Sequence, residues 1–283
     1  MKNLIVCIIL SLAGCGTSST VATLFNEELS VYTSFHSTLA GVVKPGVIIA
    51  PGWYGYVHRS TDAGRSWEKR SNGVKNNYAL EITGDTILTG SEGKRPARSA
   101  DGGSTWELLP ETGLDAIYKT RFISSPDGHH IWISDQMHVF SLNHSEHAWK
   151  QVPLPSASEP AALTLGTDAA WILDSRGVLF RSADDGTSWA EQYRLPDPDR
   201  FDLSANEVAQ SYIRMEKAGR GIMLLYQRTP LRWCAFTTVD GGITWRERSM
   251  PQIQGVIHLS RDGTILTVRT DSRSIAVYRR SKE

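Results

Sequence analysis

Short apolar runs separated by Gly, Asp, Ser and Pro recur along the chain from about residue 40 to its end. Runs such as GVIIA, DTILTG, HHIWIS, AAWILD, IMLLY and GTILTV have the length of single strands, and most precede a second short apolar run. Runs bounded in this way are typical of β-strands. Apart from a stretch at 204–210, no segment of comparable length has a convincing helical period. The pattern therefore predicts an all-β fold.

A polar motif follows the second run of several pairs and is nearly the same each time. Four clean copies read RSTDAGRSWEK, RSADGGSTWEL, RSADDGTSWAE and TTVDGGITWRE. The first two aspartates are 39 positions apart, and the following gap of 83 positions holds a degenerate copy, FSLNHSEHAWK. Several strands in each period of about forty residues describe the blade of a β-propeller.

Dividing the chain at this period gives six blades, at 34–72, 73–111, 112–154, 155–195, 196–251 and 252–283. The last range has three strand candidates and lacks an outer strand. The N-terminal segment TLFNEELSVYT is the natural donor, because pairing it there closes the ring and removes exposed strand edges. We predict a six-bladed propeller closed by an N-terminal strand. Seven blades would need a period shorter than the observed one.

The motif has the composition of a stapled tight turn between the third and outer strands of a blade. In the first copy, Asp62 can accept backbone N–H groups across the turn, as in Asx turns. Gly64 supplies a positive-φ position without a Cβ penalty. Trp67 can fold back as an apolar plug, with its N–H available to a partner. These roles are structural and need no ligand.

The pattern S-x-D-x-G-x-[TS]-W resembles the Asp-box, or BNR repeat, of sialidases, sortilin-type receptors and the photosystem II stability/assembly factor family. In those families the box lies at the edge of the propeller, away from the site. The resemblance therefore implies the β-propeller fold and a structural role for the boxes. The box residues here are Asp62, Trp67, Asp101, Trp106, Asp184, Trp189, Asp240 and Trp245.

The first residues have the composition of an export signal. Lys2 precedes an apolar run that is too short to span a bilayer, and the tetrad LAGC ends at Cys15. LAGC resembles a bacterial lipobox, which implies a signal peptide at 1–14, lipidation of Cys15, a tether at 15–22 and one propeller domain at 23–283. Gly16 in place of Asp implies the outer membrane, facing the periplasm. The alternative is a plain secretory signal with an accidental cysteine.

The turns that join the second and third strands of all blades converge on the face opposite the boxes, where propellers usually bind ligands. These turns are rich in arginine and carry exposed-looking aromatics. Guanidinium forks and aromatic plates suit an anionic or peptide ligand, whereas the alternative is that these are solvated turn residues. The predicted binding residues are Trp53, Tyr54, Lys94, Arg95, Arg176, Arg228, Arg232 and Arg273.

The composition narrows the function further. Lys and Arg total 30 and so do Asp and Glu, so the net charge of zero argues against a nucleic-acid partner. His144 and His147 form an H-x-x-H pair without a third ligand nearby, which predicts no metal site. Cys234 lies in an apolar run and is expected to be a buried, inert thiol. We find no cofactor motif and predict none.

The leading hypothesis is a lipid-anchored, non-catalytic binding propeller of the cell envelope. Its partner would be an envelope or secreted protein, or an anionic ligand, and its only membrane contact would be the lipid anchor. The alternative is a divergent glycan-acting hydrolase, with candidate acids Glu92, Asp135, Asp174 and Asp271. A conventional sialidase is disfavoured, because that family places an arginine in an F/Y-R-I-P motif before the first box, and no arginine precedes Arg59 here.

Overall fold

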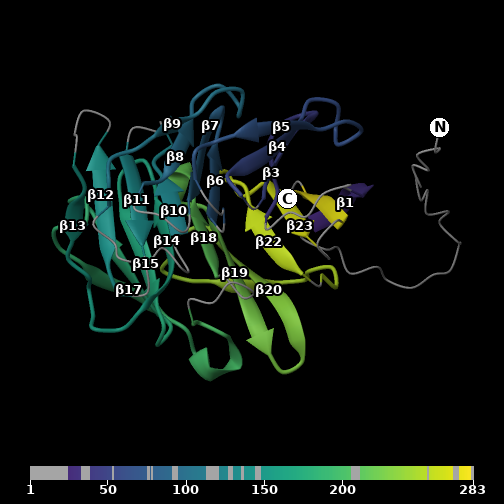
Figure 1. Ribbon diagram of the computed structural model, residues 1–283. Coiled ribbons are helices and arrows are strands. Elements are labelled where there is room, and N and C mark those ends of the chain that lie inside the picture. The colour runs from purple at the N-terminus through teal and green to yellow at the C-terminus, as the bar shows by residue number, and fades with distance from the viewer. Residues whose placement is uncertain are drawn as a thin grey trace, which may run out of the picture.

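The computed structural model describes residues 25–32, 39–52, 54–74, 77, 79–90, 95–112, 121–126, 130–134, 137–143, 148–204, 211–253, 255–269 and 274–281. Within them lie six antiparallel four-stranded sheets that follow one another around a ring (Figure 1). No helix among the described residues is long and apolar enough to cross a membrane. The all-β, six-bladed prediction is confirmed.

The blades are numbered here in chain order. Blade one contains β2 (Gly41–Lys44), β3 (Val47–Pro51), β4 (Tyr56–Ser60) and β5 (Glu68–Ser71), and blade two contains β6 (Ala79–Thr83), β7 (Thr86–Gly90), β8 (Ala97–Ser99) and β9 (Glu107–Leu108). Blade three contains β10 (Arg121–Ser124), β11 (His130–Ser134), β12 (Val139–Asn143) and β13 (Lys150–Val152), and blade four contains β14 (Pro160–Leu165), β15 (Ala170–Asp174), β16 (Val178–Ser182) and β17 (Ala190–Arg194). Blade five contains β18 (Tyr212–Met215), β19 (Gly221–Arg228), β20 (Leu231–Thr238) and β21 (Arg246–Arg248), preceded by the short 3₁₀ helix η1 (Pro198–Arg200); a second, η2 (Lys217–Gly219), joins β18 to β19.

Blade six is assembled from both ends of the chain. It contains β22 (Val256–Leu259), β23 (Ile265–Arg269) and β24 (Ser274–Arg280), and its outer strand is β1 (Phe25–Tyr32). Figure 1 shows β1, in purple, beside the yellow C-terminal strands. The register runs from Phe25 opposite Arg280 to Tyr32 opposite Ser274. The predicted closure of the ring by an N-terminal strand is therefore confirmed.

Each box forms the turn between the third and fourth strands of its blade. In the first box, Ser60 Oγ accepts a hydrogen bond from the Gly64 N–H at 2.7 Å and donates one to Asp62 Oδ1 at 2.8 Å. Asp62 also accepts the Ser66 N–H at 2.8 Å and the Ser66 hydroxyl at 2.6 Å. Gly64 has φ of +85° and its carbonyl accepts the Trp67 indole N–H at 3.0 Å. The side chains of Ser60, Asp62, Ser66 and Trp67 thus bond inside their own turn.

The boxes also contact the preceding blade, which the sequence analysis did not anticipate. A Cβ placed on Gly103 would lie 2.5 Å from Ile49 Cδ1 of blade one, and a Cβ on Gly186 would lie 2.4 Å from Val152 Cγ1 of blade three. The Trp189 indole N–H donates to the Pro153 carbonyl at 2.8 Å, across the same boundary. The boxes of blades two and four therefore fix their own turns and also set the spacing to the preceding blade.

Candidate functional site

The ring has two different ends. One end carries the boxes together with the turns between first and second strands, as shown by the hydrogen bond from the Gly102 N–H to the Asp85 carbonyl at 2.9 Å. The opposite end carries the turns between second and third strands, because antiparallel strands alternate in direction. We call the second end the turn face. The predicted binding residues that the structure describes lie in or beside these second-to-third connections; they are Tyr54, Arg95, Arg176, Arg228 and Arg232.

The central axis is crossed by a buried ion pair. Arg214 comes from β18, the innermost strand of blade five, and Glu81 comes from β6, the innermost strand of blade two. Arg214 Nη2 lies 2.7 Å from Glu81 Oε2, and the two side chains are 3% and 1% exposed. Blades two and five lie opposite each other in a ring of six. The pair therefore joins opposite sides of the ring.

A second contact crosses the axis between another opposed pair, blades three and six. Arg261, which follows β22, donates from Nε to the Ser124 carbonyl at 3.0 Å, at the end of β10. Burial lowers the pKa of Arg261 to about 10, so it remains charged at neutral pH. Burial lowers the pKa of His258, on β22, to about 3, so this imidazole is neutral. The crossing lies at the box end of the ring and fills the axis there with side chains.

Not all of the predicted site residues lie among the residues that the structure describes. Cys15, Trp53, Lys94 and Arg273 lie outside the described residues, as do Glu92, Asp135 and Asp271. Tyr54 is 78% exposed in the β3–β4 turn, with φ of +62°. Arg95 is held against blade two, because its Nε donates to the Leu109 carbonyl at 2.8 Å and its Nη2 to the Leu108 carbonyl at 3.2 Å.

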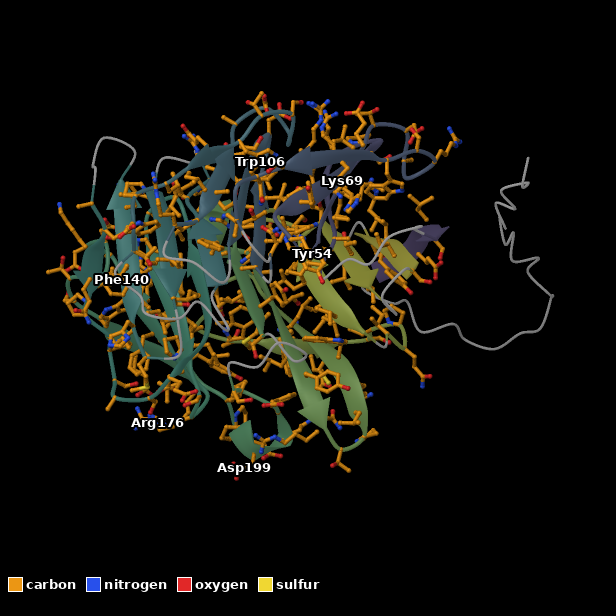
Figure 2. The ribbon with its side chains drawn as sticks, in the orientation of Figure 1. Tyr54, Lys69, Trp106, Phe140, Arg176 and Asp199 are labelled. Carbon is orange, nitrogen blue, oxygen red and sulfur yellow. The ribbon has the colours of Figure 1, made fainter. Side chains whose placement is uncertain are left out.

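Arg176 is bonded within its own turn in blade four. Its Nε and Nη2 lie 3.2 and 3.1 Å from Asp174 Oδ2, and its side chain is 60% exposed. Asp174 Oδ1 accepts the N–H groups of Arg176 at 3.0 Å and Val178 at 2.9 Å, and Ser156 donates to Oδ2 at 3.1 Å. This candidate acid thus organises a turn. Figure 2 shows Arg176 and Tyr54 at separate positions of the ring.

Arg228 and Arg232 are brought together at the tip of the β19–β20 hairpin. Arg232 Nε donates to Gln227 Oε1 at 3.2 Å, and the same oxygen accepts the Arg200 Nε–H at 3.0 Å. Arg228 Nη2 lies 3.8 Å from Asp202 Oδ1. Both arginines thus contact the segment before β18, Arg228 through Asp202 and Arg232 through the Gln227 oxygen that also binds Arg200.

The same network includes Glu247 and Cys234. Arg200 binds the Glu247 carboxylate through Nη1 at 2.9 Å and Nη2 at 2.6 Å, and this contact lowers the pKa of Glu247. Arg232 Nη2 lies 3.8 Å from the same carboxylate. Burial raises the pKa of the Cys234 thiol, which is 3% exposed. Cys234 is therefore a buried, protonated thiol, as the sequence indicates.

Exposed apolar side chains accompany the arginines on the turn face. Tyr54, Met137 and Leu231 occupy second-to-third turns of blades one, three and five, and are 78%, 52% and 68% exposed. The box end has exposed Val239 and Ile243, both in the box of blade five. Isolated exposed apolar residues are ordinary, but three on alternate blades of one face suit contact with a partner.

The sequence alone did not reveal the buried Arg214–Glu81 pair at the axis or the Arg200–Glu247 pair. Glu81 lies within the strand-like run ALEIT, and Arg214 within YIRM, so each is a charge inside an apolar run. A charge at such a position indicates a buried partner, and that was the available signal. Among the described residues, no group of three His, Cys, Asp or Glu side chains is placed to hold a metal ion.

Comparisons with known proteins show that the fold is similar to solved structures, but they assign the chain to no family. No protein-family model matches the sequence, and no curated protein is similar to it. A YCF48 structure solved with a bound D1 peptide is 13% identical over 93% of this chain and 98% of its own, with a TM-score of 0.52. YCF48 from Cyanidioschyzon merolae is 11% identical over 91% of this chain and 99% of its own, with a TM-score of 0.50.

A third similar structure is that of an enzyme, and this chain matches only part of it. The GH74 xyloglucanase from Xanthomonas campestris is 16% identical over 85% of this chain but only 44% of its own, with a TM-score of 0.56. The chain has the fold of an Asp-box propeller. At these identities the likeness shows fold alone, so function has to be argued from this chain's own residues.

Proposed function

We propose that this chain is a non-catalytic binding propeller, anchored by a lipid on Cys15 in the bacterial cell envelope, that holds a partner protein on its turn face. The observation that carries the proposal is the asymmetry of the ring. The box end is occupied by stapled turns and by the Arg214–Glu81 crossing. The turn face presents the exposed Arg228 and Arg232 beside Leu231 on blade five, and an exposed Tyr54 on blade one. Tyr and Arg are enriched in the energetically dominant positions of protein interfaces.

The likeness to YCF48 supports the same role, because that structure contains a bound peptide and spans nearly the whole of this chain. The lipid anchor rests on the lipobox-like LAGC alone. Because Gly16 rather than Asp follows the LAGC tetrad, we also propose that the protein lies at the outer membrane, facing the periplasm.

The test compares two surface variants of the full chain. Tyr54→Ser, Met137→Ser and Leu231→Ser together remove the exposed apolar groups of the turn face. Val239→Ser and Ile243→Ser remove those of the box end and serve as the matched control. Proteins captured from solubilised envelopes are quantified by mass spectrometry with the wild type and both variants. We expect the turn-face variant alone to lose the captured protein, with an unchanged melting temperature. Equal capture by all three would refute the proposal.

A glycan-acting hydrolase requires two carboxylates roughly 5–10 Å apart at the site. Asp174 is the one candidate acid within the described residues, and five donor groups already engage its oxygens. The enzyme alternative therefore depends on acids elsewhere. It would be supported by hydrolysis of a xyloglucan or sialoside substrate that Glu92→Gln abolishes.

A further inference from the structure

Blade five leaves part of its third strand without an outer neighbour. β20 spans Leu231–Thr238, but β21 pairs only with Ala235, Phe236 and Thr237. In the other five blades the first residue of the third strand is paired with the outer strand, the pairs being Tyr56 with Ser71, Ala97 with Leu108, Val139 with Val152, Val178 with Arg194 and Ser274 with Tyr32. Among the described residues, 231–234 thus form an edge that no outer strand covers.

The other edge of the same hairpin is covered by the chain itself. Phe201 forms a bridge with Gln227, and the Asp202 N–H donates to the Tyr226 carbonyl at 2.8 Å. Phe201 is 3% exposed and packs edge-on against Phe236. These contacts hold the hairpin in place along its β19 edge. Along the β20 edge, alternate residues of 231–234 direct their N–H and C=O groups away from β19. Such an edge is a template for another strand.

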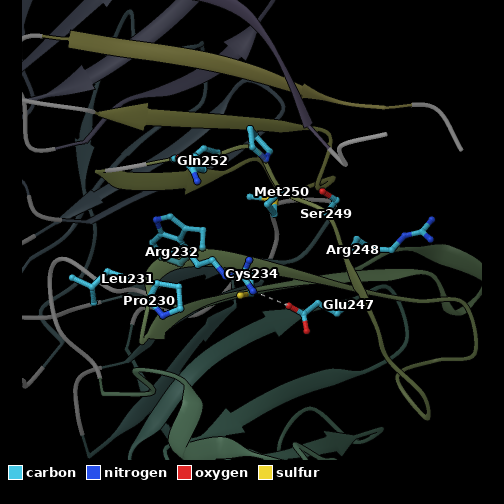
Figure 3. A pocket seen from close by; sticks show the side chains of 12 residues that line it. Pro230, Leu231, Arg232, Cys234, Glu247, Arg248, Ser249, Met250 and Gln252 are labelled. Carbon is cyan, nitrogen blue, oxygen red and sulfur yellow. Dashed lines mark ion pairs between the residues drawn. The ribbon is translucent and has the colours of Figure 1, made fainter. Parts of the chain in front are cut away.

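A pocket of about 420 Å³ lies beside this edge, open to solvent. It is bounded by residues 230–234 on one side and by 247–253 on the other, where the chain leaves β21 for blade six (Figure 3). Trp233 and Ile253 in its wall are 2% and 4% exposed, and the Trp233 indole N–H donates to the Gly255 carbonyl at 3.4 Å. The pocket therefore has a fixed apolar wall that can accept an apolar side chain.

The surroundings of the pocket are cationic. The segments 228–234 and 246–253 contain Arg228, Arg232, Arg246 and Arg248 but one acid, Glu247. Arg200, from outside these segments, already binds the Glu247 carboxylate through both of its terminal nitrogens. Arg232 is 52% exposed and lines the pocket, and the dashed line in Figure 3 marks its contact of 3.8 Å with Glu247. The local charge favours an acidic occupant.

We propose that an extended, acidic segment of a partner protein adds to the free 231–234 edge of β20 as an extra strand of blade five, with an apolar side chain in the pocket and a carboxylate on Arg232. This deepens the binding function proposed above and rests on it. Main-chain hydrogen bonds supply affinity in this mode, and alternate side chains supply specificity. About four residues are enough to follow the edge, at roughly 3.3 Å per residue.

The first experiment uses a phage-displayed library of random linear 12-residue peptides, selected on the full chain. We expect enriched peptides in which apolar and acidic residues alternate. A synthetic copy should slow amide hydrogen exchange in 231–234. Two N-methylated versions of this peptide are then made, one methylated at every odd-numbered residue and the other at every even-numbered residue. Losing two backbone donors at about 1 kcal/mol each weakens binding roughly tenfold or more, so one version should lose this much and the other little. Equal loss by both versions would contradict strand addition.

The second experiment tests the location and separates the two proposals. Arg232→Glu with Arg248→Glu should weaken the synthetic peptide at least about tenfold, whereas Arg246→Glu on the same outer strand should not. Undiminished binding to the double variant, with loss in the Tyr54→Ser/Met137→Ser variant, would overturn this site and keep the turn face. Peptide enrichment no better than on an unrelated protein would contradict both proposals. A concentration-dependent dimer that Arg232→Glu disrupts would assign the edge to a second copy of this chain.

Discussion

Arg214 and Glu81, 133 positions apart in the sequence, form an ion pair of 2.7 Å between opposite blades of the ring, and both side chains are almost completely buried. Burial raises the pKa of Glu81, and the Arg214 and Arg261 guanidinium groups oppose that shift. The pair links two blades that share no strand pairing.

Removing one member of this pair should destabilise the protein much more than removing both. Glu81→Gln leaves the Arg214 charge buried without its carboxylate, and breaking a buried pair in this way costs about 3–5 kcal/mol. Glu81→Leu with Arg214→Met replaces the charges by apolar groups and should cost less than either single change. Free energies of unfolding from urea titrations of Glu81→Gln, Glu81→Leu, Arg214→Met and the double variant measure this. Additive losses would show that the two residues act independently.

The box aspartates should make the fold sensitive to acid. Hydrogen bonds from the Ser66 hydroxyl to Asp62, from the Ser188 hydroxyl to Asp184 and from the Thr244 hydroxyl to Asp240 lower the pKa of each carboxyl from 3.8 to about 2. A carboxyl with a lowered folded-state pKa contributes stability above its unfolded value and loses it as the pH falls through the folded one. The melting temperature should therefore fall between about pH 4 and pH 2.

Asn variants at these positions provide the control for that pH dependence. Asp184→Asn keeps an acceptor oxygen but cannot titrate, so it should lower the melting temperature at pH 7 and flatten its decline below pH 4. An unchanged slope in melting temperature against pH for the Asp62→Asn, Asp184→Asn and Asp240→Asn triple variant would show that other carboxyls cause the acid sensitivity.

Substitutions at Gly103 and Gly241 distinguish two reasons why glycine occurs in the boxes, namely the backbone conformation and the contact between blades. Both have positive φ, of +83° and +75°. A Cβ on Gly103 would lie 2.5 Å from Ile49 Cδ1, whereas a Cβ on Gly241 has no neighbour within 4 Å. Gly241→Ala should cost about 1–2 kcal/mol from the left-handed backbone alone. Gly103→Ala should cost a further 1–3 kcal/mol from overpacking between blades. Thermal unfolding of both variants measures the difference, and equal losses would exclude the contact.

Cys15→Ser tests the anchor. Because more than one acyl chain is needed for stable attachment, loss of the lipidated residue should move the protein from the membrane fraction to the soluble fraction, or leave it unprocessed. Fractionation followed by immunoblotting measures this, with Cys7→Ser as the matched control inside the signal segment. A processed, membrane-bound Cys15→Ser protein would contradict the lipoprotein assignment.

The sequence predicts the fold well because the boxes are local. Every hydrogen bond that Asp62 accepts comes from within four residues, so the turn can be inferred from the motif itself. The outer strand of the last blade is also predictable, since a ring with a missing strand needs a donor. Each four-stranded sheet falls within one predicted blade range, apart from the β1 strand that closes the ring.

The site is less predictable because it depends on contacts between distant segments. Sequence alone does not indicate that Arg95 and Arg176 are each bonded within their own blades. The open edge of β20 results from the length of one hairpin relative to a three-residue outer strand, and composition alone does not encode that difference. The Arg200–Glu247 pair joins segments 47 positions apart and has no sequence motif.

The pairing of β1 with β24 has a consequence for the order of folding. Because the register joins Phe25 to Arg280, the first strand to leave the ribosome has no partner until nearly the whole chain has been made. Such distant pairings are slow to form, so the open ring persists while the later blades assemble. A chain that stops before Ser274 would keep two exposed strand edges, one at each side of the gap, and edges of this kind recruit other chains. Loss of the last seven-residue strand should therefore make the truncated chain prone to aggregation.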